Sequence, residues 1–530
     1  MRGVLVTWRG WAVAQVLFVF FWAGGQARGA VSAQVDPDAQ PSEVEADAPE
    51  AEADAVDPVD HDDDHEGEGD PAEEDRETSD DQPVGEAHVV RYYLEEFEVL
   101  GNEATRREVA TRLMLVARGE TFRADDPRIE RSKAALLATG LFEDVRFSLR
   151  RGSRRGWVVF RIHVRERWTL LVDNLSFGYT HITPYGGLGL TEMNLLGTGS
   201  ILGGAFVAGD QQQGYRLRFV DPHFLDTPYS LRVGALFNYA QDYLGFTNVT
   251  AVRPDGTVEI DHATVDYWRA GGTLGTGRVM SDTMRIDIGY RFEWIQADLP
   301  LSASYRRGGL THPVPLDLAQ GASTLSVVGI SYLYDSRDDP FLPSSGTRLR
   351  FTVDLASDVF GSDYSYAKFA VDHATHFRLP WGHSVKVEVL GGLILGQAPL
   401  FEQFFVGDLS DLVPARVLDL NFHNYPSHAI LGTAIAEMQY EDIATRVGAE
   451  YSLPLHRSRH GFLYGLDVFA SFGLYLLASS EDLAVQVAGY DGAAAFPVDL
   501  TFDLGLRFDT IIGLFRLSFS NIIGMIPRVD

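Results

Sequence analysis

Strict alternation of apolar and polar side chains, which recurs from Trp168 to the end of the chain, limits the fold more than any other feature. In "MRIDIGYRFEWI" the apolar residues of one face are Met284, Ile286, Ile288, Tyr290, Phe292 and Trp294. Strands of soluble sandwiches are usually about five or six residues long, and this run is clearly longer. A long apolar face that ends in Tyr and Trp is typical of a membrane strand, with lipid outside and a wet lumen inside.

The same alternation returns in "LSFGYT" (175–180), "YRLRFV" (215–220) and "FDLGLRF" (502–508). Strands in lipid must close into a barrel, because an open edge leaves backbone groups without hydrogen-bond partners. At roughly 20–25 residues for each strand and its loop, residues 168–530 allow about 14 to 18 strands, and an even number is expected. The prediction is an all-β transmembrane barrel of about 16 antiparallel strands.

The N-terminus has the form of an export signal. Arg2 and Arg9 precede the apolar run Trp11–Ala23, and small residues at Val31–Ala33 offer a cleavage site. This pattern predicts a signal peptide over residues 1–33. The alternative is an uncleaved anchor, but a spanning helix needs about 20 apolar residues. The chain has no cysteine, which excludes disulfides and thiolate metal sites.

Residues 34–87 form an acidic segment with 23 Asp and Glu, one Arg and no aromatic residue. Such a composition cannot bury enough apolar surface to fold, so the prediction is a disordered acidic tether. The string at Asp60–Asp70 could instead be a divalent-metal site, but nothing would hold its ligands in place. We therefore predict no cofactor.

Residues 88–167 change to a compact β-α-α-β-β pattern, a small α+β domain. A Gly-Asn turn ends the first strand, a capping box begins the first helix, and a glycine ends the second helix. The residues assigned to these turns and caps, and to the start of the next strand, are Gly101, Asn102, Thr105, Glu108, Gly140 and Phe142.

The stretch "DSRDDPFLPSSG" (335–346) predicts a tight turn at one rim of the barrel. Pro343 and Gly346 interrupt strand pairing. Asp335, Arg337 and Asp338 can pair with one another or face water there, whereas an arginine in the lipid-facing middle of a strand would cost about 2–4 kcal/mol.

This hairpin resembles one that recurs in the BamA/TamA family of outer-membrane assembly-factor barrels. Residues 187–199, 220–228 and 449–455 also resemble this family, and residues 88–167 are similar to a polypeptide-transport-associated (POTRA) domain. The resemblance implies a bacterial outer-membrane barrel, with the POTRA domain and the tether in the periplasm. It also implies assembly, insertion or translocation of unfolded outer-membrane or secreted polypeptides.

In that family a POTRA edge and the seam between the first and last barrel strands receive client strands. By that resemblance, an edge at 142–149 or 158–164 and a short seam register are expected here. The implied partners are outer-membrane lipid, client polypeptides and possible periplasmic accessory proteins or an inner-membrane partner. No nucleic acid is expected, since the basic run at 150–155 suits anionic headgroups or the acidic tether better in an exported protein.

The family carries an R-G-F/Y tip on a loop inside the lumen. Here Arg416 is followed by Val417 and Leu418, and Glu450 stands at the position of an acidic lumen partner. The resemblance therefore predicts an Arg416–Glu450 pair in the lumen. The alternative is a solvated arginine on an ordinary surface loop.

Two other functional classes remain open. The altered loop and the single POTRA domain favour a passive pore or a surface structural barrel that keeps the scaffold without insertase activity. A membrane-embedded enzyme is the third class, but the chain shows no nucleophile–base motif and no H-E-x-x-H. The prediction is that the chain is not an enzyme.

Overall fold

The computed structural model describes residues 20–23, 91–179, 183–245, 248–281, 283–307, 310–339, 342–409, 416–422, 430–458, 461–484, 487 and 489–520. The acidic segment 34–87 and, apart from residues 20–23, the predicted signal peptide lie outside the described residues.

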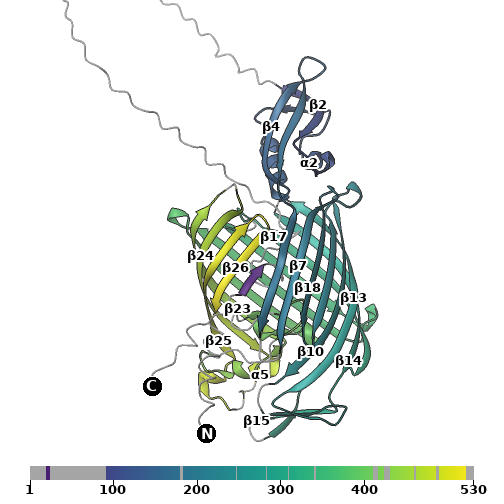
Figure 1. Ribbon diagram of the computed structural model, residues 1–530, viewed down its shortest axis with the longest axis vertical. Helices are drawn as coiled ribbons and strands as arrows, with labels where there is room; N and C mark the ends of the chain where they lie inside the picture. Colours follow the sequence, from purple (N-terminus) through teal and green to yellow (C-terminus); the bar gives the residue numbers. More distant parts are fainter. Residues whose placement is uncertain are drawn as a thin grey trace, which may run out of the picture.

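A closed antiparallel barrel forms most of the described chain (Figure 1). Its sheet has sixteen strands: β1 (Phe20–Ala23) and fifteen strands that pair in chain order from β6 to β26. The fifteen are β6 (Leu170–Tyr179), β7 (Pro184–Leu195), β8 (Ser200–Gly209), β9 (Gln213–Asp221), β10 (Tyr229–Leu244), β13 (Ala263–Ser281), β14 (Met284–Asp298), β17 (Gly321–Asp335), β18 (Gly346–Ala356), β19 (Ser365–Arg378), β20 (Ser384–Gln397), β23 (Ile443–Arg457), β24 (Leu463–Ala478), β25 (Val498–Thr510) and β26 (Gly513–Ser520). The predicted fold class is confirmed.

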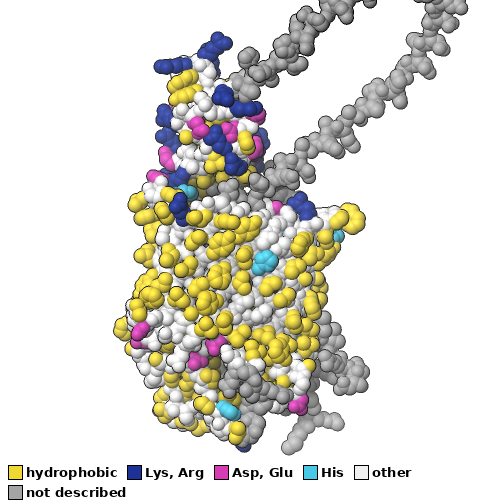
Figure 2. Space-filling model, turned by 180° about the vertical axis from the view of Figure 1, so that it is seen from behind, with side chains coloured by type: hydrophobic (Ala, Val, Ile, Leu, Met, Phe, Trp, Pro, Cys, Tyr) yellow, Lys and Arg dark blue, Asp and Glu magenta, His cyan; other side chains and the backbone are white. Residues whose placement is uncertain are grey.

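Side chains of the barrel strands alternate between an apolar exterior and a lumen face that carries buried charges as well as apolar residues. On β14, Ile288 and Trp294 are exposed on the outer face, whereas Arg285, Asp287 and Glu293 are buried on the inner face. Apolar side chains cover much of the outer wall (Figure 2). Such a surface is stable against hydrocarbon, because the closed sheet satisfies the backbone and only apolar groups meet the lipid.

The N-terminal module, residues 91–167, is a four-stranded mixed sheet with two helices, consistent with a POTRA domain. Its strand order is β3-β2-β5-β4, so β5 is central and β4 lies at an edge. The elements are β2 (Arg91–Leu100), α2 (Arg107–Arg112), β3 (Thr121–Arg123), α3 (Pro127–Ala138), β4 (Phe142–Arg151) and β5 (Trp157–Glu166). The short β3 between the helices is an addition to the predicted order.

Two glycines in the module have backbone conformations that favour glycine. Gly101 follows β2 with φ +87°, and a Cβ there would lie 2.2 Å from the carbonyl oxygen of Val164. Gly140 follows α3 with φ +69°. Asn102 donates from Nδ2 to the carbonyl of Thr105 at 2.9 Å, and Phe142 is buried at the start of β4.

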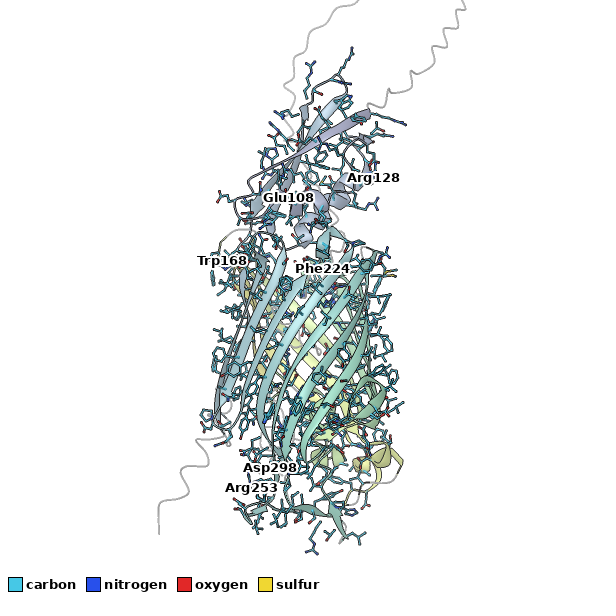
Figure 3. The ribbon with its side chains drawn as sticks, turned by 90° about the vertical axis from the view of Figure 1, so that its right-hand side faces the viewer. Glu108, Arg128, Trp168, Phe224, Arg253 and Asp298 are labelled. Carbon is cyan, nitrogen blue, oxygen red and sulfur yellow. The ribbon has the colours of Figure 1, made fainter. Side chains whose placement is uncertain are left out.

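The barrel has two different ends, which we call the module rim and the loop rim. Figure 3 shows Trp168 and Phe224 at the module rim, beside the N-terminal module, and Arg253 and Asp298 at the opposite end. A second sheet stands at the loop rim, in the order β12-β11-β15-β16. Its strands are β11 (Val249–Val252), β12 (Val258–Ile260), β15 (Ser302–Arg307) and β16 (Leu310–Pro313).

The remaining elements are short pieces in the connections. They are η1 (Phe224–Asp226), η2 (Asp358–Phe360), η3 (Pro380–Gly382), η4 (Leu400–Glu402), β21 (Phe404–Phe405), α4 (Val406–Leu409), η5 (Ala434–Glu437), β22 (Tyr440–Glu441), α5 (Ser480–Ala484) and η6 (Gly492–Ala495). Within the described ranges, no helix is long and apolar enough to cross a membrane.

Candidate functional site: seam, lumen plug and module junction

The seam is the place where the ends of the barrel sheet meet. There β1 pairs antiparallel with β26, from Phe20 opposite Ser518 to Ala23 opposite Phe515. On its other side β1 pairs antiparallel with β6 at one position, where Ala23 faces Leu175. Because β6 and β26 are both antiparallel to β1, they run in the same direction.

At the module rim, β6 contacts the turn that precedes β26. The N–H of Val172 donates to the carbonyl of Ile512 at 2.8 Å. Over the described residues, the two strands have no register pair of their own. We call the one-strand gap between them the slot. Backbone hydrogen bonds to an extended segment in the slot stabilise it more than the same bonds in water would, because lipid offers the edge groups of β6 and β26 no other hydrogen-bond partners.

The connection between β20 and β23 folds into the lumen. Its described residues, 398–409, 416–422 and 430–442, are called the lumen plug. Apolar plug side chains such as Phe401, Phe405 and Leu418 join one buried cluster with wall residues such as Tyr267 and Ile295. The plug therefore packs as a core inside the barrel, whereas a surface loop would stay in solvent.

Buried charges fix the plug at its start. Glu402 pairs with Arg291 of β14 at 2.7 Å, and Arg291 also pairs with Glu293 at 3.0 Å. Arg269 of β13 makes a two-point contact with Glu293, at 2.8 and 3.0 Å, and lies 3.8 Å from the ring centre of Phe401. Charge is thus balanced across strand wall and plug, as buried ions require.

Further contacts hold the plug to β10 and β9, the strands next to β13 in the barrel. Asp419 pairs with Arg216 of β9 at 2.7 Å. Asn238 of β10 donates from Nδ2 to the carbonyl of Leu418 at 2.8 Å. Leu418 and Asp419 both have positive φ, at +51° and +66°. Such backbone angles persist in non-glycine residues only where surrounding contacts hold them.

The predicted Arg416–Glu450 pair is wrong. Arg416 lies in the lumen, but it donates to the carbonyl of Phe401 at 2.8 Å and to Asp408 of the plug at 2.8 Å. Glu450 on β23 pairs with Arg507 of β25 at 2.8 Å and lies 3.4 Å from the Lys386 amine. Each charge is neutralised by a nearer partner, so no attraction remains to join them.

Glu450 belongs to a separate network on the barrel wall. Lys386 of β20 is directly opposite Glu450 in the strand register and also pairs with Glu388 at 2.8 Å. Arg446 lies 3.4 Å from Glu388. The sequence does not show this network, because it depends on the register of β20 against β23.

The turn between β17 and β18 lies at the module rim, as a tight connection. Asp335 and Arg337 are both buried and pair with each other at 2.6 Å. Pro343 lies in the turn. Gly346 begins β18 with φ +101°, and a Cβ there would lie 2.2 Å from the Ser336 carbonyl oxygen.

Asp338 organises the inside of this turn. Its carboxylate accepts from the backbone N–H of Ser344 at 2.8 Å and of Ser345 at 3.0 Å, and from Arg378 at 2.8 Å. Burial alone would raise the pKa of Asp338, but these hydrogen bonds outweigh it and lower the pKa to about 2. The charged carboxylate of Asp338 therefore stabilises the turn.

The module is joined to the barrel by the turn between β7 and β8. Asn194 donates from Nδ2 to the hydroxyl of Thr105 at 2.8 Å. The N–H of Arg106 donates to the carbonyl of Gly197 at 2.8 Å. A Cβ on Gly197 would lie 2.2 Å from the Ala104 carbonyl oxygen, so module and barrel approach backbone to backbone.

The predicted capping box at Thr105 and Glu108 is wrong. Helix α2 begins at Arg107, and its N-cap residue makes no side-chain cap hydrogen bond. Instead, the carboxylate of Glu166 at the end of β5 accepts from the N–H groups of Glu103, Ala104 and Thr105. Glu108 contacts Arg107 on the surface. A carboxylate from the last residue of the module's sheet thus takes the role assigned to a local cap.

Protonation of the Glu166 carboxylate in acid should weaken the contact between the module and the barrel. Burial raises the pKa of Glu166, but hydrogen bonds from Thr105, Ala104 and Glu103 outweigh it and leave the pKa below its usual 4.5. A lowered folded-state pKa gives stability above pH 4.5 that is lost as pH falls through the folded value. We expect proteolysis between module and barrel to increase in that window, and Glu166→Gln to be cut faster at neutral pH with less pH dependence. Glu143→Gln, which removes a solvent-exposed pair with Arg165, is the control and should leave both unchanged.

The described residues contain no group of three or more His, Cys, Asp or Glu placed to hold a metal ion. What the seam, the plug and the module offer is a strand-sized slot, a filled lumen and an open sheet edge on β4. The slot and the β4 edge are places where an extended polypeptide can pair through its backbone groups.

Comparison with known proteins gives a consistent result. Residues 194–412 match the model of the Omp85 superfamily domain. The outer membrane protein assembly factor BamA of Neorickettsia risticii (strain Illinois) is 22% identical over 291 residues, which cover 53% of this chain and 34% of that protein. The chain therefore spans about a third of the length of this relative.

Two solved structures share the fold. BamA from Haemophilus ducreyi lacking POTRA domains 1-3 aligns with a TM-score of 0.50 and 14% identity, over 81% of each chain. CdiB from Escherichia coli aligns with a TM-score of 0.51 and 10% identity, over 81% of this chain and 76% of that one.

Proposed function

Because the chain is an outer-membrane barrel protein of the Omp85 superfamily, we propose that it assembles, inserts or translocates polypeptides at the bacterial outer membrane. Barrels of this superfamily are assembly and transport proteins and not enzymes, which confirms the prediction of no enzymatic activity. The clients are unfolded outer-membrane or secreted polypeptides.

The slot between β6 and β26 is the observation that carries this proposal. It holds an extended segment, β1, with four register pairs on the β26 side and one on the β6 side. If export removes residues 1–33, as the sequence predicts, β1 leaves with them. The vacated slot then exposes two strand edges to a client.

The module supplies a second place for an extended chain. Of the two edges expected from the sequence, 158–164 is excluded, because β5 pairs with β2 on one side and with β4 on the other. β4 is an edge strand, and an open edge accepts an added strand through its backbone groups. We assign client capture to β4.

The filled lumen argues against the alternative of a passive pore. A conducting barrel needs a continuous wet passage, whereas here the plug builds an apolar core across the lumen and is fixed by buried ion pairs at Glu402 and Asp419. The route for a client is therefore the seam, not the lumen.

The remaining assignments concern placement in the cell. The signal peptide directs export, and the module and the acidic segment 34–87 lie in the periplasm. Outer-membrane lipid surrounds the barrel. Periplasmic accessory proteins, or an inner-membrane partner, would reach the chain through the module.

The test is a reconstituted folding assay with a small urea-unfolded outer-membrane barrel as client. Vesicles containing this protein should fold the client roughly tenfold faster than empty vesicles, which corresponds to about 1.4 kcal/mol of barrier. A photo-crosslinking residue at Leu149 on β4 should capture the client, and one at Val359 on the loop-rim connection should not. Ion conductance with no acceleration of folding would favour the passive pore and overturn the proposal.

A further inference from the structure

Three turns at the module rim share an unusual conformation. Among the non-glycine residues with positive φ in the described chain, the bulky apolar ones outside the lumen plug are Leu196, Leu225 and Trp381, with φ of +54°, +53° and +62°. Their side chains are 80%, 76% and 90% exposed. Glycine or asparagine normally occupies such positions, because a larger side chain is strained there.

Leu418 shows how burial of the side chain can compensate for such a strained backbone. It also has positive φ, but its side chain is buried in the plug core. Leu196, Leu225 and Trp381 contribute no comparable burial to the fold. Strain without packing points to a contact outside the protein.

Trp381 shows where that contact lies. The turn 380–382 packs against β23, since a Cβ on Gly382 would lie 3.6 Å from Pro454. The rings of Trp381 and His383 are 6.1 Å apart, and those of His383 and Tyr451 are 5.6 Å apart. The hydroxyl of Tyr451 also contacts Nδ1 of His383.

Tyr451 fixes the direction in which this turn faces. Its neighbours Glu450 and Ser452 are buried in the lumen, whereas Tyr451, Val447 and Leu455 are exposed on the outer face of β23. The turn therefore extends the apolar outer wall beyond the end of β19. The surface is continuous with the lipid-facing wall and not with the lumen.

We propose that Trp381 anchors the module rim in the boundary between headgroups and acyl chains of the adjacent leaflet. A Trp side chain suits that boundary, because its ring is apolar and its N–H finds polar partners at the surface. The occupant of this surface is bilayer lipid. This anchor fixes the depth of the rim that carries the N-terminal module.

The first experiment reads the position of the Trp381 ring. The full chain and Trp381→Phe are reconstituted in phosphatidylethanolamine–phosphatidylglycerol vesicles whose acyl chains carry bromine at different depths. The difference in fluorescence between the two proteins reports Trp381 alone. We expect blue-shifted emission that is quenched most by bromine near the glycerol backbone. Red-shifted emission, quenched by aqueous acrylamide and not by bromolipid, would overturn the proposal.

The second experiment separates anchoring from folding. Trp381→Asn places a residue that tolerates positive φ in the turn, so the unfolding midpoint in detergent should stay the same or rise. Insertion into vesicles should become several-fold slower. Val359→Asn is the matched control, since Val359 is similarly exposed on the turn at the other end of β19, and its insertion rate should not change. Equal insertion by Trp381→Asn and wild type would refute the anchor, and a lowered detergent midpoint would assign the side chain to stabilising the fold.

Discussion

Joining β6 to β26 through the slot should abolish assembly activity. Leu175 and Phe515 both face Ala23 of β1 in the register, so their side chains share one face and lie two strand spacings apart, about 10 Å. The chain has no native cysteine. We expect Leu175→Cys/Phe515→Cys, crosslinked by a thiol-reactive reagent of about that length, to lose client folding almost completely, because a fixed seam cannot admit a strand.

The matched control places the same reagent elsewhere on the wall. Ile288 and Val353 both face Ile330 on the intervening strand, so Ile288→Cys/Val353→Cys has the same spacing in a fully paired region. Crosslinking there should leave client folding unchanged. Reduction of a cleavable crosslinker should restore activity at the seam, and full activity in the locked seam protein would exclude the slot as the entry site.

Removal of the Glu402 carboxylate should release the plug. Glu402→Ala removes one of the two carboxylates that form ion pairs with buried Arg291, and breaking a buried pair in this way costs about 3–5 kcal/mol. The free energy of unfolding should fall by about 3 kcal/mol. Planar-bilayer recordings should show openings that the wild-type protein lacks, because the plug loses its attachment to β14.

Two variants check that the charge pair is the cause. Glu402→Gln keeps the shape and a hydrogen-bond acceptor, so its effects should be smaller. Glu437→Ala removes an exposed acid of the same plug and should change neither stability nor conductance. A closed, stable Glu402→Ala barrel would mean that the apolar core alone holds the plug.

The architecture could be predicted because its signal is local and repeated. Alternation along β14 and its neighbours follows directly from the requirement for an apolar outer face. The same holds for the module, where turn glycines at 101 and 140 mark the ends of elements. A local pattern suffices when the environment on each side of a strand is the same for every residue.

Interactions between distant segments could not be read in this way. Thr105 and Glu108 have the spacing of a cap, but Glu166, which is 61 residues from Thr105, supplies the carboxylate. Arg416 finds Asp408 within its own plug, and Glu450 finds Lys386 through strand register. The strain at Trp381 could not be predicted from the sequence either, because only its backbone angle shows it.

The common direction of β6 and β26 sets a counting rule for any guest. In an antiparallel sheet each added strand reverses direction, so only an odd number of guest strands can bridge the two seam strands with every neighbour antiparallel. A single strand meets this condition, as β1 does. A guest hairpin does not, and can pair fully with one side only. Such a guest stays paired to the host through one of its edge strands only. Its other edge strand remains free to pair with the guest's own first strand, so the new barrel closes separately from its host.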